Sequence, residues 1–287
     1  MSQSLPLLGD LGDKRLLTLG VQDCYFTFDQ LSRFLTRHRI PHRALAPGEV
    51  LQTTGFRHVP EAARAGYADF VHQKTLFRML GFEPGNIVSL DFSGYEGADI
   101  THDLNEPVPG ELHGRFDLVL DGGTIEHVLS LKDSLFNISR LCRVGGVVMH
   151  LSPVDYINHG FFNVNADLFR SYYRANGFEE LALKYVAIPN HPRRAESHYL
   201  EFEPDRLPFS LQPYYSILLH GVYRKTRDQT PNVPQQGFYE EAWGERKTPG
   251  EHPPSLQWLR TWAKGSFLGT ELLLPMLVRR RGRKVRL

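Results

Sequence analysis

The sequence predicts an α/β fold with a mostly parallel sheet, because short apolar segments alternate with segments of helical periodicity. The expected strands of this alternating block cover residues 87–91, 98–101, 116–120, 146–151 and 179–187. The helices expected within it cover residues 125–142 and 165–176, where apolar residues recur every three or four positions. Three of the strands end in polar residues, which is typical of the edge where open parallel sheets bind ligands.

The flanking segments extend this block on both sides. A first strand is expected at 15–20, helices at 28–35 and 60–80, and a last strand at 215–223 that completes the sheet edge. Residues 1–225 then form one domain, in which 36–80 is an inserted helical and loop cover. Residues 226–287 form an extension with a proline-rich linker, a helix near 256–278 and a basic tail.

Composition is that of a soluble globular protein, with 41% hydrophobic and 23% charged residues in 287. The two cysteines, Cys24 and Cys142, lie far apart, which indicates neither a disulfide framework nor a zinc motif. No signal peptide or long apolar run is visible, so we expect a cytoplasmic protein. Six of the 33 basic residues lie in the last nine, so the rest of the chain is net acidic and does not suit nucleic-acid binding.

The segment Phe116–Val128 carries the strongest local signal. An apolar strand runs into Asp121, two glycines and Thr124, which we expect to cap the following helix. Asp91 ends the strand at 87–91 in the same way. Carboxylates at the ends of parallel strands are placed to accept hydrogen bonds from a ligand such as a ribose diol.

The order of motifs over residues 13–225 resembles the class I S-adenosylmethionine-dependent methyltransferases. The motifs are Asp91 after a strand, then Ala98–Pro107, Phe116–Val119, Ile125–Val128, Arg143–Gly146 and Asn176–Phe178. The sequence looks closest to a branch with a Gly-Thr-Ile-Glu-His-Val motif and a later His-Gly-Phe loop. The resemblance implies a Rossmann-like, doubly wound sheet of about seven strands. It also implies methyl transfer from S-adenosylmethionine to a small-molecule or saccharide acceptor.

For the cofactor, the resemblance implies that Asp91 binds the ribose and that Asp103 accepts from the adenine amino group. Leu104 would cover one face of the adenine ring, and Asp121 would line the pocket. The residues leave simpler readings open. Asp91 could be an exposed turn residue, and Asp103 could close an Asx turn on its own backbone.

The loop after the first strand departs from the family pattern. A glycine-rich loop lets the backbone approach a ligand closely, but only Gly20 is kept here. Gln22 and Cys24 stand where further glycines are expected. Gln22 and Asp23 could instead bond the amino-acid end of the cofactor, or the turn could hold no ligand at all.

Glu126 and His127 follow the fourth strand, where a transferred methyl group would emerge, and we assign them catalytic roles. A histidine can take a proton from a hydroxyl nucleophile near neutral pH. Tyr156, His159 and Phe161 follow the fifth strand and are expected to contact the acceptor, as part of a lid over it. The alternatives are a hydrogen-bonded residue at a helix start for His127 and an ordinary surface loop for the other three.

Three further features receive plainer interpretations. His150 lies within an apolar strand and is expected to be a hydrogen-bonded core residue. The group His191–His198 has no metal-ligand spacing, and we expect no metal site. The tail is expected to be a solvated end, with weak contact to anionic membranes as the alternative. Two other functions stay open: a non-catalytic methyltransferase-like binding module, and a nicotinamide-dependent oxidoreductase, which is disfavoured because no Gly-x-Gly-x-x-Gly opens a helix.

Overall fold

The computed structural model describes residues 9–53, 68–156, 159–189, 196–201, 215–236 and 283–286. The strands are β1 (Leu16–Leu19), β2 (Ile87–Asp91), β3 (Ile100–Thr101), β4 (Phe116–Asp121), β5 (Cys142–Pro153), β6 (Phe178–Pro189), β7 (Glu196–Glu201), β8 (Tyr215–Lys225) and β9 (Arg283–Arg286). The α-helices are α1 (Phe28–Arg37), α3 (Gln73–Leu80), α4 (Leu131–Leu141) and α5 (Ala166–Ala175). Short 3₁₀ turns are η2 (Pro47–Glu49), η4 (Pro84–Asn86), η5 (Gly110–Leu112) and η6 (Ile125–His127).

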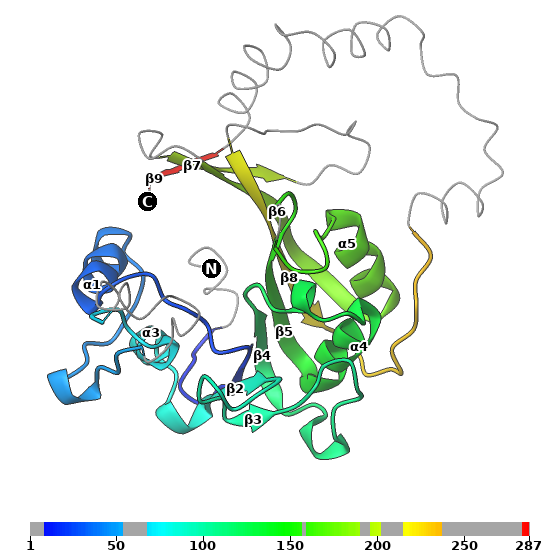
Figure 1. The fold of residues 1–287 in the computed structure, drawn as a ribbon, viewed down its shortest axis with the longest axis horizontal. Helices are drawn as coiled ribbons and strands as arrows, with labels where there is room; N and C mark the ends of the chain where they lie inside the picture. The colour runs from blue at the N-terminus through cyan, green and yellow to red at the C-terminus, as the bar shows by residue number, and fades with distance from the viewer. Residues whose placement is uncertain are drawn as a thin grey trace, which may run out of the picture.

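All of these strands belong to one sheet, in the order β3-β2-β1-β4-β5-β8-β6-β7-β9 (Figure 1). The first five strands in that order are parallel, and β8 pairs antiparallel with both β5 and β6. The chain runs outward from β1 to β3, then crosses to β4 and continues outward the other way. The direction of winding therefore reverses between β1 and β4, which are neighbours in a Rossmann-like, doubly wound sheet.

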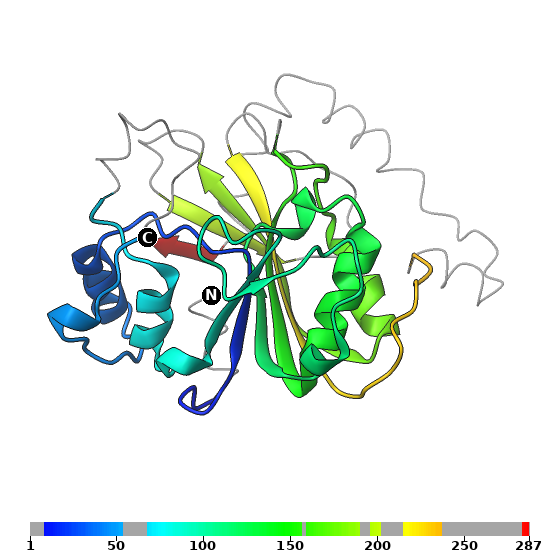
Figure 2. The ribbon, with the colours of Figure 1, turned by 60° about the horizontal axis from the view of Figure 1, so that its bottom comes forward.

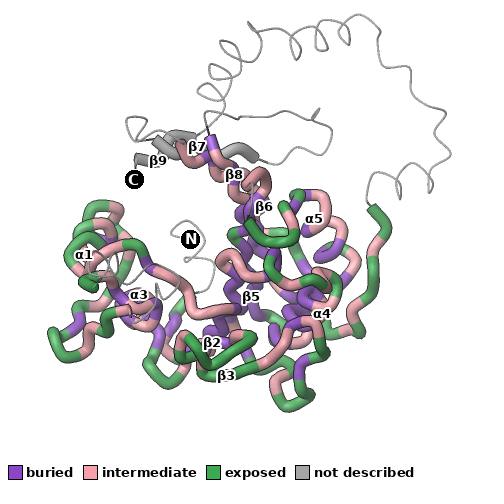
Figure 3. Tube along the Cα trace, viewed as in Figure 1, coloured by how far each residue is buried: buried purple, intermediate pink, exposed green. Residues whose placement is uncertain are grey.

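Helices cover the two faces of the sheet, as Figure 2 shows, with α1 and α3 on one side and α4 and α5 on the other. The alternation of side chains along each strand divides the core in the same way. In β1, Leu17 and Leu19 pack with α4 and α5, whereas Leu16 packs with α1 and α3. The strands buried between these layers form the centre of the molecule in Figure 3.

The helix starts are set by side-chain caps. Thr27 caps α1 and forms a capping box with Gln30. His72 caps α3 and Asn165 caps α5, each through a side chain that accepts from a backbone N–H. Gly177 follows α5 with a φ of +76°, as expected for a residue that ends a helix in the left-handed conformation.

Two expected helices are shorter in the structure. The segment expected as one helix over 125–142 is the turn η6 followed by α4, because Ser130 caps a new helix by accepting from Asp133 N–H. The backbone N–H of Ser130 donates to Asn105 Oδ1 at 2.9 Å, which stabilises the break between η6 and α4. The helix expected over 60–80 begins at Gln73 within the described residues, and 60–67 lies outside them.

The extension after residue 225 is described only in part. Residues 226–236 run as irregular chain, where Asn232 exchanges hydrogen bonds with Asn176 at the end of α5. The expected helix near 256–278 and residues 190–195, which include His191, lie outside the described residues. Four residues of the basic tail, Arg283–Arg286, form β9 against β7 and so extend the sheet. None of the helices in the described part of the chain has the length and apolar character that a bilayer span requires.

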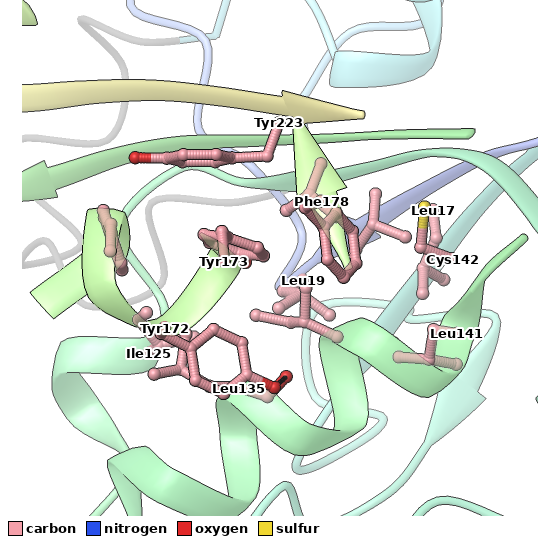
Figure 4. Packing of buried hydrophobic residues seen from close by; sticks show 14 of the residues in the cluster. Leu17, Leu19, Ile125, Leu135, Leu141, Cys142, Tyr172, Tyr173, Phe178 and Tyr223 are labelled. Carbon is pink, nitrogen blue, oxygen red and sulfur yellow. Dashed lines mark hydrogen bonds between the residues drawn. The ribbon is translucent and has the colours of Figure 1, made fainter. Parts of the chain in front are cut away.

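Tyr173 of α5 and Tyr223 of β8 lie together in the core (Figure 4), but their hydroxyl groups differ in hydrogen bonding. The rings of Tyr173 and Tyr223 are 4.1 Å apart and nearly parallel. The Tyr173 hydroxyl bonds His150 Nε2 at 2.6 Å, whereas the buried Tyr223 hydroxyl has no partner among the described residues.

The two tyrosines therefore make a matched pair for a stability measurement. Tyr173→Phe should lower the free energy of unfolding by about 1–3 kcal/mol, because it leaves a buried imidazole nitrogen unbonded. Tyr223→Phe should be neutral or stabilising, because it removes a hydroxyl that is already unsatisfied. Urea denaturation of both variants decides this, and equal losses would contradict the assigned hydrogen bonding.

Candidate functional site

The candidate site lies at the carboxyl ends of β1, β2 and β4, next to the point where the winding reverses. Gly20 follows β1 with a φ of +75° and donates its N–H to Leu90 O at 2.7 Å. A Cβ atom at Gly20 would lie 3.0 Å from Thr124 Oγ1 and 3.8 Å from Asp91 Oδ2. Three strand ends thus converge on one glycine, which is the arrangement that the sequence predicted.

Asp91 is partly exposed at the end of β2 and has its carboxylate directed toward this glycine. Its Oδ1 accepts from Ser93 N–H at 3.4 Å, and its backbone carbonyl accepts from His102 N–H at 2.8 Å. The backbone is therefore fixed by β3, while the carboxylate keeps capacity for further acceptor bonds. This environment suits a carboxylate that binds a diol.

The crevice between β1 and β4 is closed by two side chains. Gln22 Nε2 donates to Leu19 O at 2.6 Å, and Thr124 Oγ1 donates to the same carbonyl at 2.6 Å. The Gln22 side chain lies so close to Gly122 that a Cβ atom there would overlap Gln22 Oε1. Where the family pattern has a glycine, this chain has a side chain folded into the crevice.

Asp121 is not placed to contact a cofactor, contrary to the expectation from sequence. It is fully buried, and its Oδ1 accepts from the N–H groups of Thr124 and Ile125 at 3.0 and 3.3 Å. Its Oδ2 bonds His150 Nδ1 at 2.7 Å. Asp121, and not Thr124, therefore caps η6, and His150 is the hydrogen-bonded core histidine that was expected.

The residues expected around adenine are only partly available. Asp103 Oδ1 accepts from both the backbone N–H and the side-chain amide of Asn105, at 2.9 and 2.7 Å, so an Asx turn forms. The backbone hydrogen bond from Asn105 lowers the pKa of Asp103, which keeps the group ionised. The Leu104 side chain is 4% exposed and belongs to the core, so it does not lie open beside a ring.

Glu126 and His127, the expected catalytic residues, contact His159 of the loop after β5. His159 Nε2 lies 3.4 Å from Glu126 Oε1, and the rings of His127 and His159 are 4.8 Å apart. Glu126 is fully buried, and its Oε2 has no hydrogen-bond partner within the described residues. Burial and the nearby Asp121 charge raise the pKa of Glu126 to about 7, and burial lowers the pKa of His127.

The loop after β5 is bonded to the Glu126 backbone. Phe161 N–H donates to Glu126 O at 2.7 Å, and Gly160 approaches so closely that a Cβ atom would lie 2.8 Å from the same oxygen. The ring of Tyr156 is tilted by 54° to that of His159, with ring centroids 5.7 Å apart. The structure therefore places Tyr156, His159 and Phe161 beside Glu126 and His127, while their contact with an acceptor stays a prediction.

The cluster also offers three possible metal ligands. One ligand atom from each of Glu126, His127 and His159 lies within 4.8 Å of the others. A tetrahedral zinc ion with bonds of about 2.0–2.1 Å needs ligand atoms roughly 3.3 Å apart. The His159–Glu126 separation fits that spacing, but the cluster as a whole is wider, so it would have to contract around an ion.

Comparisons with known proteins concern the fold alone. No family model matches the chain, and no curated protein matches it in sequence. A SAM-dependent methyltransferase from Aquifex aeolicus superposes with a TM-score of 0.35 at 8% identity, over 77% of this chain and 87% of that one. A 16S rRNA methyltransferase from Catenulisporales acidiphilia gives a TM-score of 0.38 at 11% identity, over 80% of this chain and 93% of that one. A Thermotoga maritima methyltransferase gives a TM-score of 0.33 at 18% identity, over 79% of this chain and 87% of that one.

The strand order decides the fold. Five parallel strands are wound in both directions from β1, and an antiparallel β8 lies between β5 and β6. The chain has a Rossmann-like, doubly wound α/β fold. Its function has to be argued from its own residues, because the fold alone does not specify one.

The raised pKa of Glu126 predicts a specific dependence of stability on pH. The folded state favours the neutral carboxyl, so the stability that Glu126 contributes is full below pH 4.5 and is lost as pH rises to about 7. Wild type should therefore lose this stability between pH 5 and pH 8, whereas Glu126→Gln should not. The free energy of unfolding of the variant minus that of wild type should be larger at pH 8 than at pH 5. Urea unfolding at both pH values measures this, with exposed Glu111→Gln as the control. An equal difference at the two pH values would show that Glu126 ionises normally.

Proposed function

We propose that this protein binds S-adenosylmethionine at the ends of β1, β2 and β4 and transfers its methyl group to a small-molecule or saccharide acceptor. One observation carries the proposal: Gly20 and the Asp91 carboxylate face each other beside the reversal point of the sheet. Ligands of open α/β sheets bind at this point. The two cysteines are free and buried, which is compatible with a reducing, cytoplasmic location.

The nucleoside half of the cofactor fits the residues present. Asp91 would accept from both ribose hydroxyls, and the missing side chain at Gly20 leaves room for the sugar. Asp103 would use the carboxylate oxygen that is not engaged by Asn105. For Leu104 and Asp121 we propose indirect roles, since both side chains are buried.

The methionine half requires a movement. Gln22 occupies the crevice over Gly122, so its side chain must leave Leu19 O before a ligand can lie there. Once Gln22 is displaced, the Asp23 carboxylate could bond the charged amino-acid end. The displacement costs one hydrogen bond, about 0.5–1.5 kcal/mol, which lowers affinity without abolishing it.

The bound cofactor supplies an electrophilic methyl group, and the protein supplies the proton acceptor. His127 is exposed and its pKa is lowered, so the imidazole is neutral at pH 7 and can accept a proton from an acceptor hydroxyl. Glu126 holds His159 beside it through the 3.4 Å contact. Tyr156, His159 and the 65% exposed Phe161 would form the acceptor side of the site. The choice of a small molecule or saccharide rests on family analogy.

The second candidate function is a non-catalytic binding module. The closed crevice favours it, because Gln22 and Thr124 satisfy the Leu19 carbonyl without any ligand. Calorimetric titration with S-adenosylhomocysteine and with nicotinamide dinucleotides separates the candidates. Saturable binding of the nucleoside thioether alone supports the proposal, and binding of neither supports the second candidate.

Asp91→Asn should weaken S-adenosylhomocysteine binding by about 10- to 100-fold, because charge-assisted hydrogen bonds to the ribose are lost. Asp13→Asn is the matched control, since Asp13 is exposed before the opposite end of β1. Calorimetry gives both affinities, and circular dichroism checks the fold. An unchanged affinity in the Asp91 variant would remove this residue from the site.

Gln22→Gly should strengthen S-adenosylhomocysteine binding by about 2- to 10-fold, because it opens the crevice and removes the hydrogen bond that a ligand must displace. The exposed Gln52 provides the control substitution, Gln52→Gly, measured in the same titration. Weaker binding in the Gln22 variant would mean that this side chain holds the ligand and does not obstruct it.

A further inference from the structure

A large cavity lies away from the cluster at Glu126, between the α1 and α3 helices and the sheet. Its volume is about 780 Å³, which falls within the ~300–1,000 Å³ of small-molecule sites. The sheet contributes residues of β4, β5 and β8, and the loop after β1 closes one end. The Glu126, His127 and His159 side chains are not among the residues that line it.

The described walls of this cavity are mainly apolar. They include Leu31 and Phe34 from α1, Phe77 from α3, and Leu120, Met149 and Leu151 from the sheet. No lysine or arginine is among the described lining residues. His220 also lines the cavity, and burial lowers its pKa to about 4, so this side chain is neutral at pH 7. The described lining residues therefore include no cationic side chain at pH 7.

One polar group in the wall lacks a partner. Gln73, the first residue of α3, is fully buried and its Oε1 accepts from Gln22 N–H at 3.0 Å. Its Nε2 has no hydrogen-bond partner among the residues that the structure describes. A buried donor without an acceptor destabilises the protein, so an oxygen brought by a ligand would be bound favourably at this point.

The neighbouring thiol does not offer a reactive alternative. Cys24 lines the same cavity at 5% exposure, and burial raises its pKa to about 12. Since the thiolate is the nucleophilic form, this cysteine acts as an apolar wall residue. The chemistry of the cavity is thus that of reversible binding.

We propose that this cavity binds an uncharged, largely apolar small molecule that carries one carbonyl oxygen, which accepts a hydrogen bond from Gln73 Nε2. The apolar walls would bury the body of the molecule, and the single unpartnered donor would fix its orientation. Gln22 and Gly122 line the cavity and also meet in the crevice between β1 and β4. An occupant would therefore lie next to the proposed cofactor site, although its binding does not depend on methyl transfer.

Fluorescence titration with prodan, an uncharged naphthyl ketone, tests the proposal on the full chain. We expect saturable binding with a blue-shifted emission. Gln73→Glu keeps the acceptor for Gln22 N–H but replaces the donor by an oxygen, so prodan affinity should fall about 10-fold or more. Leu31→Trp narrows the cavity from the opposite wall and should abolish binding. The exposed Gln52→Glu is the charge-matched control and should bind as wild type.

Two results would overturn the proposal: wild-type protein that shows no saturable signal, or variants at Gln73 and Leu31 that bind prodan as wild type does. The substitutions lie on different elements, so loss of the fold in one still leaves the other to decide. S-adenosylhomocysteine binding is measured on the same samples. A Leu31→Trp variant that loses prodan but keeps the nucleoside separates this site from the proposed cofactor site.

Discussion

The arrangement of this site depends on the hydrogen bonds that the buried carboxylate of Asp121 accepts. This carboxylate binds the N–H groups of Thr124 and Ile125 and the ring of His150, and so ties the end of β4 to β5 and to the turn η6. His150 in turn bonds Tyr173 on α5. A carboxylate without these partners would be costly to bury, so the sheet edge and the α5 layer are stabilised together.

The turn η6 and the residue before it position Thr124, Glu126 and His127 at the site. Thr124 reaches back to the Leu19 carbonyl beside Gly20, while Glu126 and His127 extend toward the loop after β5. The backbone carbonyl of Glu126 then accepts from Phe161 N–H, which fixes the loop that carries His159. The proposed nucleoside side and acceptor side of the crevice are therefore connected through four consecutive residues, 124–127, and a change at Asp121 would disturb both.

The sequence allowed strands β1 to β6 and β8, and their order along the chain, to be predicted, together with the polar strand ends of β2 and β4. It did not predict β7 or β9, and the basic tail was expected to be a solvated end, whereas Arg283–Arg286 pairs with β7. It did not reveal the break between η6 and α4, because the apolar spacing runs on through Leu131 while the break depends on Asn105, which is distant in sequence. Nor could it show that Asp121 faces the core, since its partners His150 and Tyr173 come from other elements. The burial of Gln73 could not be predicted, because an amide within a helix carries no local signal of burial.

We propose that S-adenosylmethionine enters the crevice between β1 and β4 and that its methionine half displaces Gln22. Amide chemical shifts of nitrogen-15-labelled protein, followed while S-adenosylmethionine is added, test it most directly. We expect the signals of Gly20, Gly122 and Gly123 to move together, and the signal of the Gln22 side-chain amide to lose the shift of a hydrogen-bonded group. Glycine signals that stay in place at saturating ligand, or shifts confined to the α4 and α5 face, would contradict it.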